Sequence, residues 1–331
     1  MKKRGSICFL VLILILLLSG CVWGKKVTPP EADLLNCKAN YVVAQEGVCE
    51  WKKAEDKTSK LVLYKKDKEI LLAEMDVAPG QMLSDGRNLY LCGAENVHQY
   101  DPKTGKVTVL FEVEAPVLWK YMLVGDELCF VDERAIFVRY HLTDGTKTEY
   151  PLSDIEIVDM KAFGFGYADG YLYYNRRTQE ISRFVSENLN TGEVLELARV
   201  YGAHNIYRHE NGNLYFASVN VLTNQNALCY LDQSGVVHTL AEGVGFRIDY
   251  HFRNEWIYYS SGYSSLYRVR LDGTQMEKVL EGAGYPKLFQ KRLYLQTLSQ
   301  VDGEMQTVLY ELNEETMELS KIPWGTKPTN Q

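Results

Sequence analysis

Histidine and acidic residues are the first candidates for chemistry in this sequence. His204 and His209 are five positions apart, and Asp154, Glu156 and Asp159 form an acidic group. Side chains an odd number of positions apart on one strand point to opposite faces, so the two histidines are badly placed to share a metal ion. No Asp-x-Asp-x-Asn/Asp-Gly loop accompanies the acidic group. We therefore expect hydrogen-bonded or exposed histidines, a solvated acidic surface and no metal site.

Compact catalytic motifs are absent from the sequence. It has no Gly-x-Ser-x-Gly nucleophile elbow, no His-Glu-x-x-His zinc motif, no phosphate-binding loop before a Lys-Ser or Lys-Thr pair, and no Gly-x-Gly-x-x-Gly turn that opens a helix. We therefore predict a protein that has no catalytic residues, no cofactor and no enzymatic activity.

The N-terminus carries a different kind of chemical signal. A basic start at residues 2–4 precedes an uncharged apolar run at 7–18, which is shorter than the roughly 20 residues that span a membrane and is typical of a signal peptide. Leu18-Ser19-Gly20-Cys21 resembles the bacterial lipobox. The resemblance implies that residues 1–20 are removed and that Cys21 receives fatty acyl chains. The chain would then be anchored on the extracytoplasmic side of the cell membrane, or of the outer membrane in a two-membrane cell. An ordinary signal peptide is the alternative.

Five cysteines remain beyond the leader and the lipidated position. They are Cys37, Cys49, Cys92, Cys129 and Cys229. Because the number is odd, at least one thiol is unpaired or joined to another chain. Cys37 and Cys49 are the only pair close in sequence, and they are our candidate disulfide. The others have no Cys-x-x-Cys spacing and are expected to be small buried hydrophobes.

Composition excludes one class of partner and favours β-structure. The formal net charge is −7 with the basic leader included, which excludes nucleic acid as a partner because phosphate binding needs a basic surface. Twenty-three tyrosines against nine prolines favour strands. The length fits one large domain.

A short strand, often rich in tyrosine, recurs seven times along the chain. The seven copies are Val48-Cys49-Glu50, Leu89-Tyr90-Leu91, Leu128-Cys129-Phe130, Leu172-Tyr173-Tyr174, Leu214-Tyr215-Phe216, Ile257-Tyr258-Tyr259 and Leu293-Tyr294-Leu295. Their central positions are 36 to 44 residues apart, which matches a four-stranded propeller blade of about 40 residues. Turn sequences such as Asp85-Gly86 and Asp272-Gly273 recur in phase with them.

We therefore predict an all-β protein with a β-propeller of seven four-stranded blades, each in sequence order. Six or eight blades are the alternatives. The predicted organisation is a lipidated tether at 21–36, the propeller at 37–323 and a C-terminal tail at 324–331.

The repeat resembles known propellers. Ile257-Tyr258-Tyr259-Ser260-Ser261 and Leu172-Tyr173-Tyr174-Asn175 are similar to the YWTD blades of LDL-receptor-type propellers, and to uncharacterised bacterial lipoproteins that carry such propellers. No blade has an intact Tyr-Trp-Thr-Asp sequence, and the YWTD family has six blades. Asp101-Pro-Lys-Thr-Gly105 also resembles the quinoprotein-like repeats of a lipoprotein that assists outer-membrane protein assembly, although the tryptophan of those repeats is missing. These resemblances imply a fold and little about function.

One face of such a propeller should carry recognition. The connection between the second and third strands of a blade lies on the same face as the crossover to the next blade, and long loops on a rigid scaffold commonly bind partners. The segments 52–59, 176–183, 220–226 and 299–305 are predicted as long loops of this kind. The candidate ligand-binding residues are Trp119, Arg176, Tyr201, His204, Phe246, Arg247 and Tyr285. The alternative is that several of them fill the central channel.

Three functions follow from this pattern. The leading hypothesis is a membrane-anchored binding or scaffold protein that presents this face to a protein or peptide. The second is recognition of a cell-wall or exported glycan, with Trp119, Tyr201 and Tyr285 stacking on sugars. The third is a hydrolase or lyase with its site at the channel mouth, since catalytic residues of propeller enzymes are often scattered in sequence.

Overall fold

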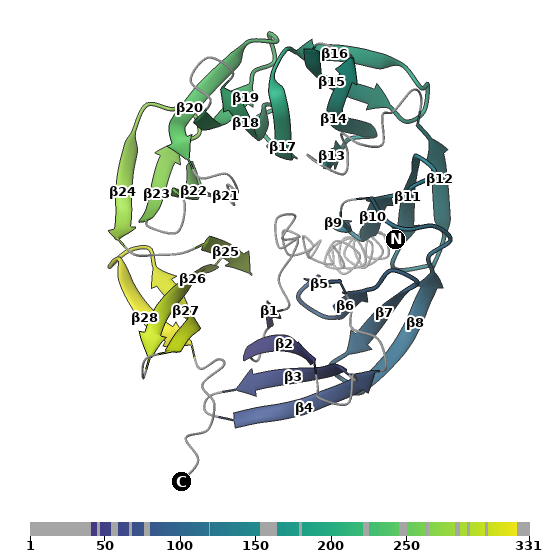
Figure 1. The fold of residues 1–331 in the computed structure, drawn as a ribbon, viewed down its shortest axis with the longest axis vertical. Coiled ribbons are helices and arrows are strands. Elements are labelled where there is room, and N and C mark those ends of the chain that lie inside the picture. The colour runs from purple at the N-terminus through teal and green to yellow at the C-terminus, as the bar shows by residue number, and fades with distance from the viewer. Residues whose placement is uncertain are drawn as a thin grey trace, which may run out of the picture.

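The computed structural model describes residues 41–322, apart from 45–46, 54–58, 66–67, 76–79, 119, 153–163, 179–180, 221–224, 245–249, 262–264, 282–284, 290–291 and 302–303. Every regular element in this part of the chain is a β-strand, numbered β1 to β28 (Figure 1). The predicted leader, tether and tail lie outside the described residues and stay predictions.

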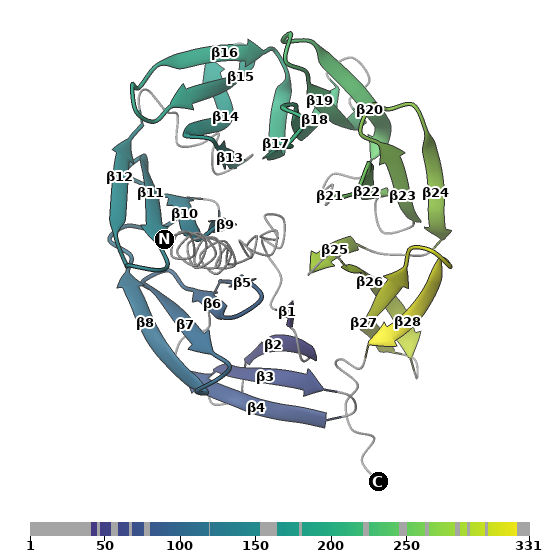
Figure 2. The same cartoon turned by 180° about the vertical axis from the view of Figure 1, so that it is seen from behind.

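The strands form seven separate four-stranded sheets arranged around a central axis (Figure 1 and Figure 2). Each sheet consists of four consecutive antiparallel strands, so the first and last sheets exchange no strand. The first strand of each blade is innermost and the fourth is outermost, and the seventh blade lies beside the first. The prediction of seven blades in sequence order is confirmed, and the alternatives of six or eight are wrong.

The strand bounds show the four positions of each blade. The innermost strands are β1 (Tyr41–Ala44), β5 (Gln81–Ser84), β9 (Met122–Val124), β13 (Phe165–Ala168), β17 (Tyr201–Arg208), β21 (Tyr250–Arg253) and β25 (Tyr285–Phe289). The second strands are β2 (Gly47–Lys53), β6 (Leu89–Cys92), β10 (Glu127–Val131), β14 (Tyr171–Thr178), β18 (Leu214–Asn220), β22 (Trp256–Ser261) and β26 (Arg292–Val301). The third strands are β3 (Ser59–Lys65), β7 (Asn96–Asp101), β11 (Ile136–His141), β15 (Ile181–Asn188), β19 (Gln225–Leu231), β23 (Ser265–Arg270) and β27 (Glu304–Asn313). The outermost strands are β4 (Lys68–Met75), β8 (Lys106–Glu112), β12 (Lys147–Pro151), β16 (Val194–Ala198), β20 (Val237–Val244), β24 (Met276–Glu281) and β28 (Glu318–Ile322).

The recurring strand is the second strand of every blade, and in blades 2 to 7 it is buried on both faces. In β22, Ile257 and Tyr259 pack against blade 5, whereas Tyr258 between them packs against blade 7. Successive side chains of a strand point to opposite faces, so both faces can be covered only if the run is continuously apolar or aromatic. Full burial of a large apolar side chain such as Phe216, which is 0% exposed, stabilises the fold by about 1.5–3 kcal/mol.

Aspartate and glycine shape the turns between third and fourth strands. The Asp101 carboxylate accepts a hydrogen bond from the backbone N–H of Lys103 at 2.8 Å, and Gly105 closes the turn with a φ of 68°. Asp272 and Gly273, whose φ is 78°, form the corresponding turn of blade 6. Such φ values favour glycine, which confirms the predicted turn positions.

The innermost strands of blades 4 and 5 approach each other closely at Gly166. A Cβ added there would lie 2.7 Å from the carbonyl oxygen of Ile206 and 2.9 Å from its Cβ. Only glycine leaves room for β13 to pack directly against β17.

Gly166→Ala should therefore lower the free energy of unfolding by about 1–3 kcal/mol, because the added methyl group overpacks this contact. Urea denaturation measures the difference. Gly80→Ala is the matched control, since a Cβ there meets only the Cys92 carbonyl oxygen at 3.8 Å. Equal losses in the two variants would contradict the role assigned to Gly166.

Candidate binding face

The ring has two distinct faces. In each blade, the connection between the second and third strands and the crossover to the next blade lie on one face, which we call the crossover face. The turns between the first and second strands and between the third and fourth strands lie on the other, which we call the turn face (Figure 1).

Two of the four predicted long loops of the crossover face are paired strand, whereas the central residues of 52–59 and 220–226 lie outside the described part of the chain and those two loops stay predictions. β14 and β15 stay paired up to Thr178 and Ile181, and β26 and β27 stay paired up to Val301 and Glu304. The interpretation of 176–183 and 299–305 as long loops is therefore wrong. Their polar residues continue the antiparallel ladder of each strand pair.

The structure brings Tyr201 and His204 to one edge of the crossover face, between blades 4 and 5, whereas Arg176 lies on the opposite side of β14, toward blade 3. The side chain of Asn175, which is 2% exposed, accepts a hydrogen bond from the N–H of Ala203 at 2.9 Å and donates one to the Ala203 carbonyl. Ala203 lies between Tyr201 and His204, so this bridge fixes the start of β17 against blade 4. Tyr201 opens β17 and is 45% exposed.

β17 has an irregular backbone around His204. Its pairing with β18 shifts register on both sides of this residue, and Gly202 and Asn205 have φ values of 66° and 50°. A left-handed backbone conformation costs a non-glycine residue such as Asn205 on the order of 1 kcal/mol or more. Bulges of this kind commonly change the direction of side chains next to binding sites. The Tyr250 hydroxyl donates to the Asn205 carbonyl and braces the bulge from blade 6.

The His204 ring is fixed by this bulge. Its Nδ1 lies 2.9 Å from the carbonyl oxygen of Gly202. A carbonyl can only accept, so Nδ1 carries a proton. The second predicted histidine, His209, packs among aromatic rings instead, with ring centroids 5.1 Å from Phe252 and 5.9 Å from Tyr215.

The other predicted binding residues are only partly placed. Tyr285 begins β25, the innermost strand of blade 7, where the backbone alone is described. Trp119, Phe246 and Arg247 lie outside the described residues, as does the acidic group at 154–159. Their role in binding stays a prediction.

The sequence did not lead us to predict the buried amide side chains that bridge neighbouring blades. Gln81 of β5, 6% exposed, donates to the Tyr121 carbonyl and accepts from the Tyr121 N–H, both at 2.9 Å. Asn175 bridges blades 4 and 5 in the same way. A single Gln or Asn among apolar strand residues could have indicated these links, because a buried amide side chain needs hydrogen-bond partners.

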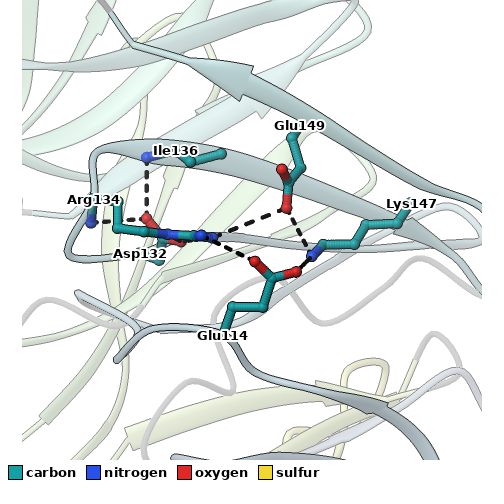
Figure 3. A network of polar contacts seen from close by, with 6 residues as sticks. All are labelled: Glu114, Asp132, Arg134, Ile136, Lys147 and Glu149. Atoms are coloured by element: carbon teal, nitrogen blue, oxygen red, sulfur yellow. Dashed lines mark hydrogen bonds and ion pairs between the residues drawn. The ribbon is translucent and has the colours of Figure 1, made fainter.

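A network of charged side chains ties blade 2 to blade 3 near the crossover face (Figure 3). The buried Asp132 accepts hydrogen bonds from the backbone N–H groups of Arg134 and Ile136 at 2.9 and 3.1 Å. The Arg134 guanidinium reaches Asp132 at 2.7 Å and Glu114 at 2.9 Å. Lys147, with Arg134, lowers the pKa of Glu114 by hydrogen bonding and charge. These carboxylates are all paired, so the network is a structural link.

Histidines on the turn face are paired with the aspartates of the turns. His141 lies with Nε2 2.7 Å from Asp126 and Nδ1 2.9 Å from Asp144, and the two carboxylates, Asp144 first, raise its pKa above the ordinary value. His238 Nε2 lies 2.7 Å from Asp232. Within the part of the chain that the structure describes, no three His, Cys, Asp or Glu side chains are grouped to hold a metal ion.

The cysteines of the described strands are buried. Cys92, Cys129 and Cys229 are free and at most 5% exposed, as predicted for small hydrophobes, and burial raises the pKa of Cys229 to about 11. Cys49 is also buried, in β2. Its predicted partner Cys37 lies outside the described residues, so that disulfide stays a prediction.

Comparisons with known proteins show the fold alone. No protein-family model matches the chain, and no curated protein matches it in sequence. A puromycin-hydrolyzing peptidase of Mycobacterium tuberculosis is 10% identical with a TM-score of 0.60, and the match covers 89% of this chain and 54% of that one. An oligogalacturonate lyase in complex with manganese is 12% identical with a TM-score of 0.55, covering 86% and 92%. A nidogen/laminin complex is 11% identical with a TM-score of 0.47, covering 71% and 92%.

His141→Gln should lower the free energy of unfolding more at about pH 6 than at about pH 8. The folded pKa of His141 is raised, so its contribution is fully present below the ordinary pKa of about 6.5 and is lost as the pH rises through the folded value. Urea denaturation at the two pH values measures the difference from the unsubstituted protein.

His98→Gln provides the comparison for this measurement. Burial lowers the pKa of His98, so its contribution should be smaller at about pH 6 than at about pH 8. The same pH trend in both variants would show that the two aspartates do not stabilise the protonated form of His141.

Proposed function

We propose that this protein is a membrane-anchored, non-enzymatic binding or scaffold protein whose crossover face binds a protein or peptide. The observation that carries the proposal is the fixed edge between blades 4 and 5, where the Asn175 bridge holds the start of β17, with the exposed Tyr201 and the bulge around His204, against blade 4. Tyrosine and arginine are enriched in the energetic centres of protein interfaces, and a backbone ordered in advance lowers the entropic cost of binding.

Two alternatives have less support. The glycan hypothesis depends on stacking by Trp119, Tyr201 and Tyr285, and Tyr201 is the one whose side chain the structure describes. The hydrolase or lyase hypothesis needs titratable groups that converge at the channel mouth. In the described blades, the carboxylates with lowered pKa values, such as Glu114 and Asp144, are paired with neighbouring side chains away from the innermost strands.

Membrane attachment through Cys21 is part of the proposal and rests on the lipobox resemblance. Among the described residues, the chain has no helix with the length and apolar character needed to cross a membrane. Two or more acyl chains would provide durable attachment, since one chain alone anchors only marginally.

A photoreactive phenylalanine analogue in place of Tyr201 should form discrete protein adducts in intact cells. The same analogue in place of Leu195, which is 59% exposed on the outer strand of the same blade pair, is the matched control and should form none.

Gel mobility and mass spectrometry of the adducts decide between the partner classes. Equal labelling from positions 201 and 195, or no labelling from 201, would overturn the binding face. An adduct that survives protease and is removed by glycosidase would favour the glycan hypothesis.

Cys21→Ser should abolish incorporation of an alkyne-tagged palmitate and release the protein from the membrane pellet. Cys8→Ser is the control, because Cys8 lies inside the leader and should leave labelling unchanged. Palmitate labelling that persists in the Cys21 variant would contradict lipidation at this position.

A further inference from the structure

A cavity of about 640 Å³ opens on the turn face between blades 1 and 2. Its apolar wall is a row of register partners across blade 1, with Cys49 of β2 opposite Leu63 of β3, and Leu63 opposite Ile70 of β4. The other wall is formed by two turns of blade 2, which contribute Arg87 and Lys103.

The cavity exists because blade 1 carries small side chains where another blade carries rings. The corresponding row of blade 5 is Tyr215, Tyr230 and His238, again register partners across its second, third and fourth strands. Their rings pack in succession, with centroids 5.5 and 4.6 Å apart. A thiol and two aliphatic chains cannot fill the same space, so the blade 1 row leaves its side of the interface open.

The polar wall of the cavity carries two exposed cations, Arg87 and Lys103, and one carboxylate, Asp101. Arg87 and Lys103 are exposed, and neither forms an ion pair within the described part of the chain. The nearby carboxylates are engaged by the turns themselves. Asp85 accepts the backbone N–H of Arg87 at 2.7 Å and the Tyr90 hydroxyl at 2.7 Å, and Asp101 accepts the backbone N–H of Lys103 at 2.8 Å. Arg87 and Lys103 are therefore left as charged donors at the cavity, beside carboxylates that are already hydrogen-bonded within the turns.

We propose that this cavity binds a small organic carboxylate with a compact apolar body. The apolar body packs against the Cys49, Leu63 and Ile70 row, and the carboxylate pairs with Arg87 and Lys103. Cavities of roughly 300–1,000 Å³ that combine an apolar wall with a few placed polar groups are typical of small-molecule sites. A small ligand fits better than a polypeptide because the apolar lining, which Leu72, Leu89 and Tyr100 complete, ends at the two turns of blade 2. The site lies on the face opposite the crossover face and is independent of the partner proposed there.

Fluorine NMR with para-trifluoromethyl-hydrocinnamate tests this site on the full chain as purified from its own cell fraction, with protein-free buffer of the same composition as the blank. We expect saturable binding of one molecule per chain. The corresponding amide has the same shape without the charge, and it should bind at least about tenfold more weakly. Arg87→Ser and Lys103→Ser should each weaken carboxylate binding about three- to fivefold, as expected for an exposed ion pair.

Two further variants control for folding and for general charge. Lys106→Ser removes an exposed cation of the same blade that does not line the cavity, and it should change affinity less than about twofold. Ile70→Trp places a ring in the blade 1 row at the position of His238 in blade 5, and it should abolish binding while the melting temperature is retained. Equal binding of the amide, unchanged affinity in both serine variants, or no saturable binding by the unsubstituted protein would overturn the proposal.

Discussion

Burial of the second strand on both faces is the constraint on which this structure depends. A blade cannot cover Ile257 and Tyr259 on one side and Tyr258 on the other without a neighbour on each side. Because the same requirement recurs in blade after blade, the sheets are stable as a ring and not as separate units. Side chains that fit between two sheets therefore determine where each innermost strand and each connection can lie.

That packing is apolar, and the finer alignment of neighbouring blades comes from a few polar links. Gln81 and Asn175 each bond both backbone groups of a residue in the next blade, and Asp132 organises the connection that Arg134 ties to Glu114. Each of these polar groups is satisfied by the groups that it positions, so together they fix the backbone without leaving unpaired charge in the interior. The two faces differ as a result: one holds a bulged strand braced by adjacent blades, and the other holds repeated aspartate turns.

The sequence was sufficient for the architecture because its signal is local and repeated. Six of the seven second strands follow a turn sequence that contains Gly, Asp or Asn, and seven copies of the strand in phase indicated the blade number directly. The candidate site was less predictable. The bulges around His204 depend on Asn175 and Tyr250, which come from other blades. The continued ladder of β14 and β15 looked like a loop because its residues are polar. The small side chain of Cys49, at a position where five of the seven copies have tyrosine, was visible in the alignment, but its effect on packing required the strand register.

Because every sheet is taken from one uninterrupted stretch of about 40 residues, a blade corresponds to a single continuous segment of the gene. No sheet combines strands from the two ends of the domain, so loss or duplication of one such segment would leave every remaining sheet whole. The number of blades in this architecture can therefore change by unequal recombination. The contacts that must then be rebuilt are those between side chains at one interface between blades.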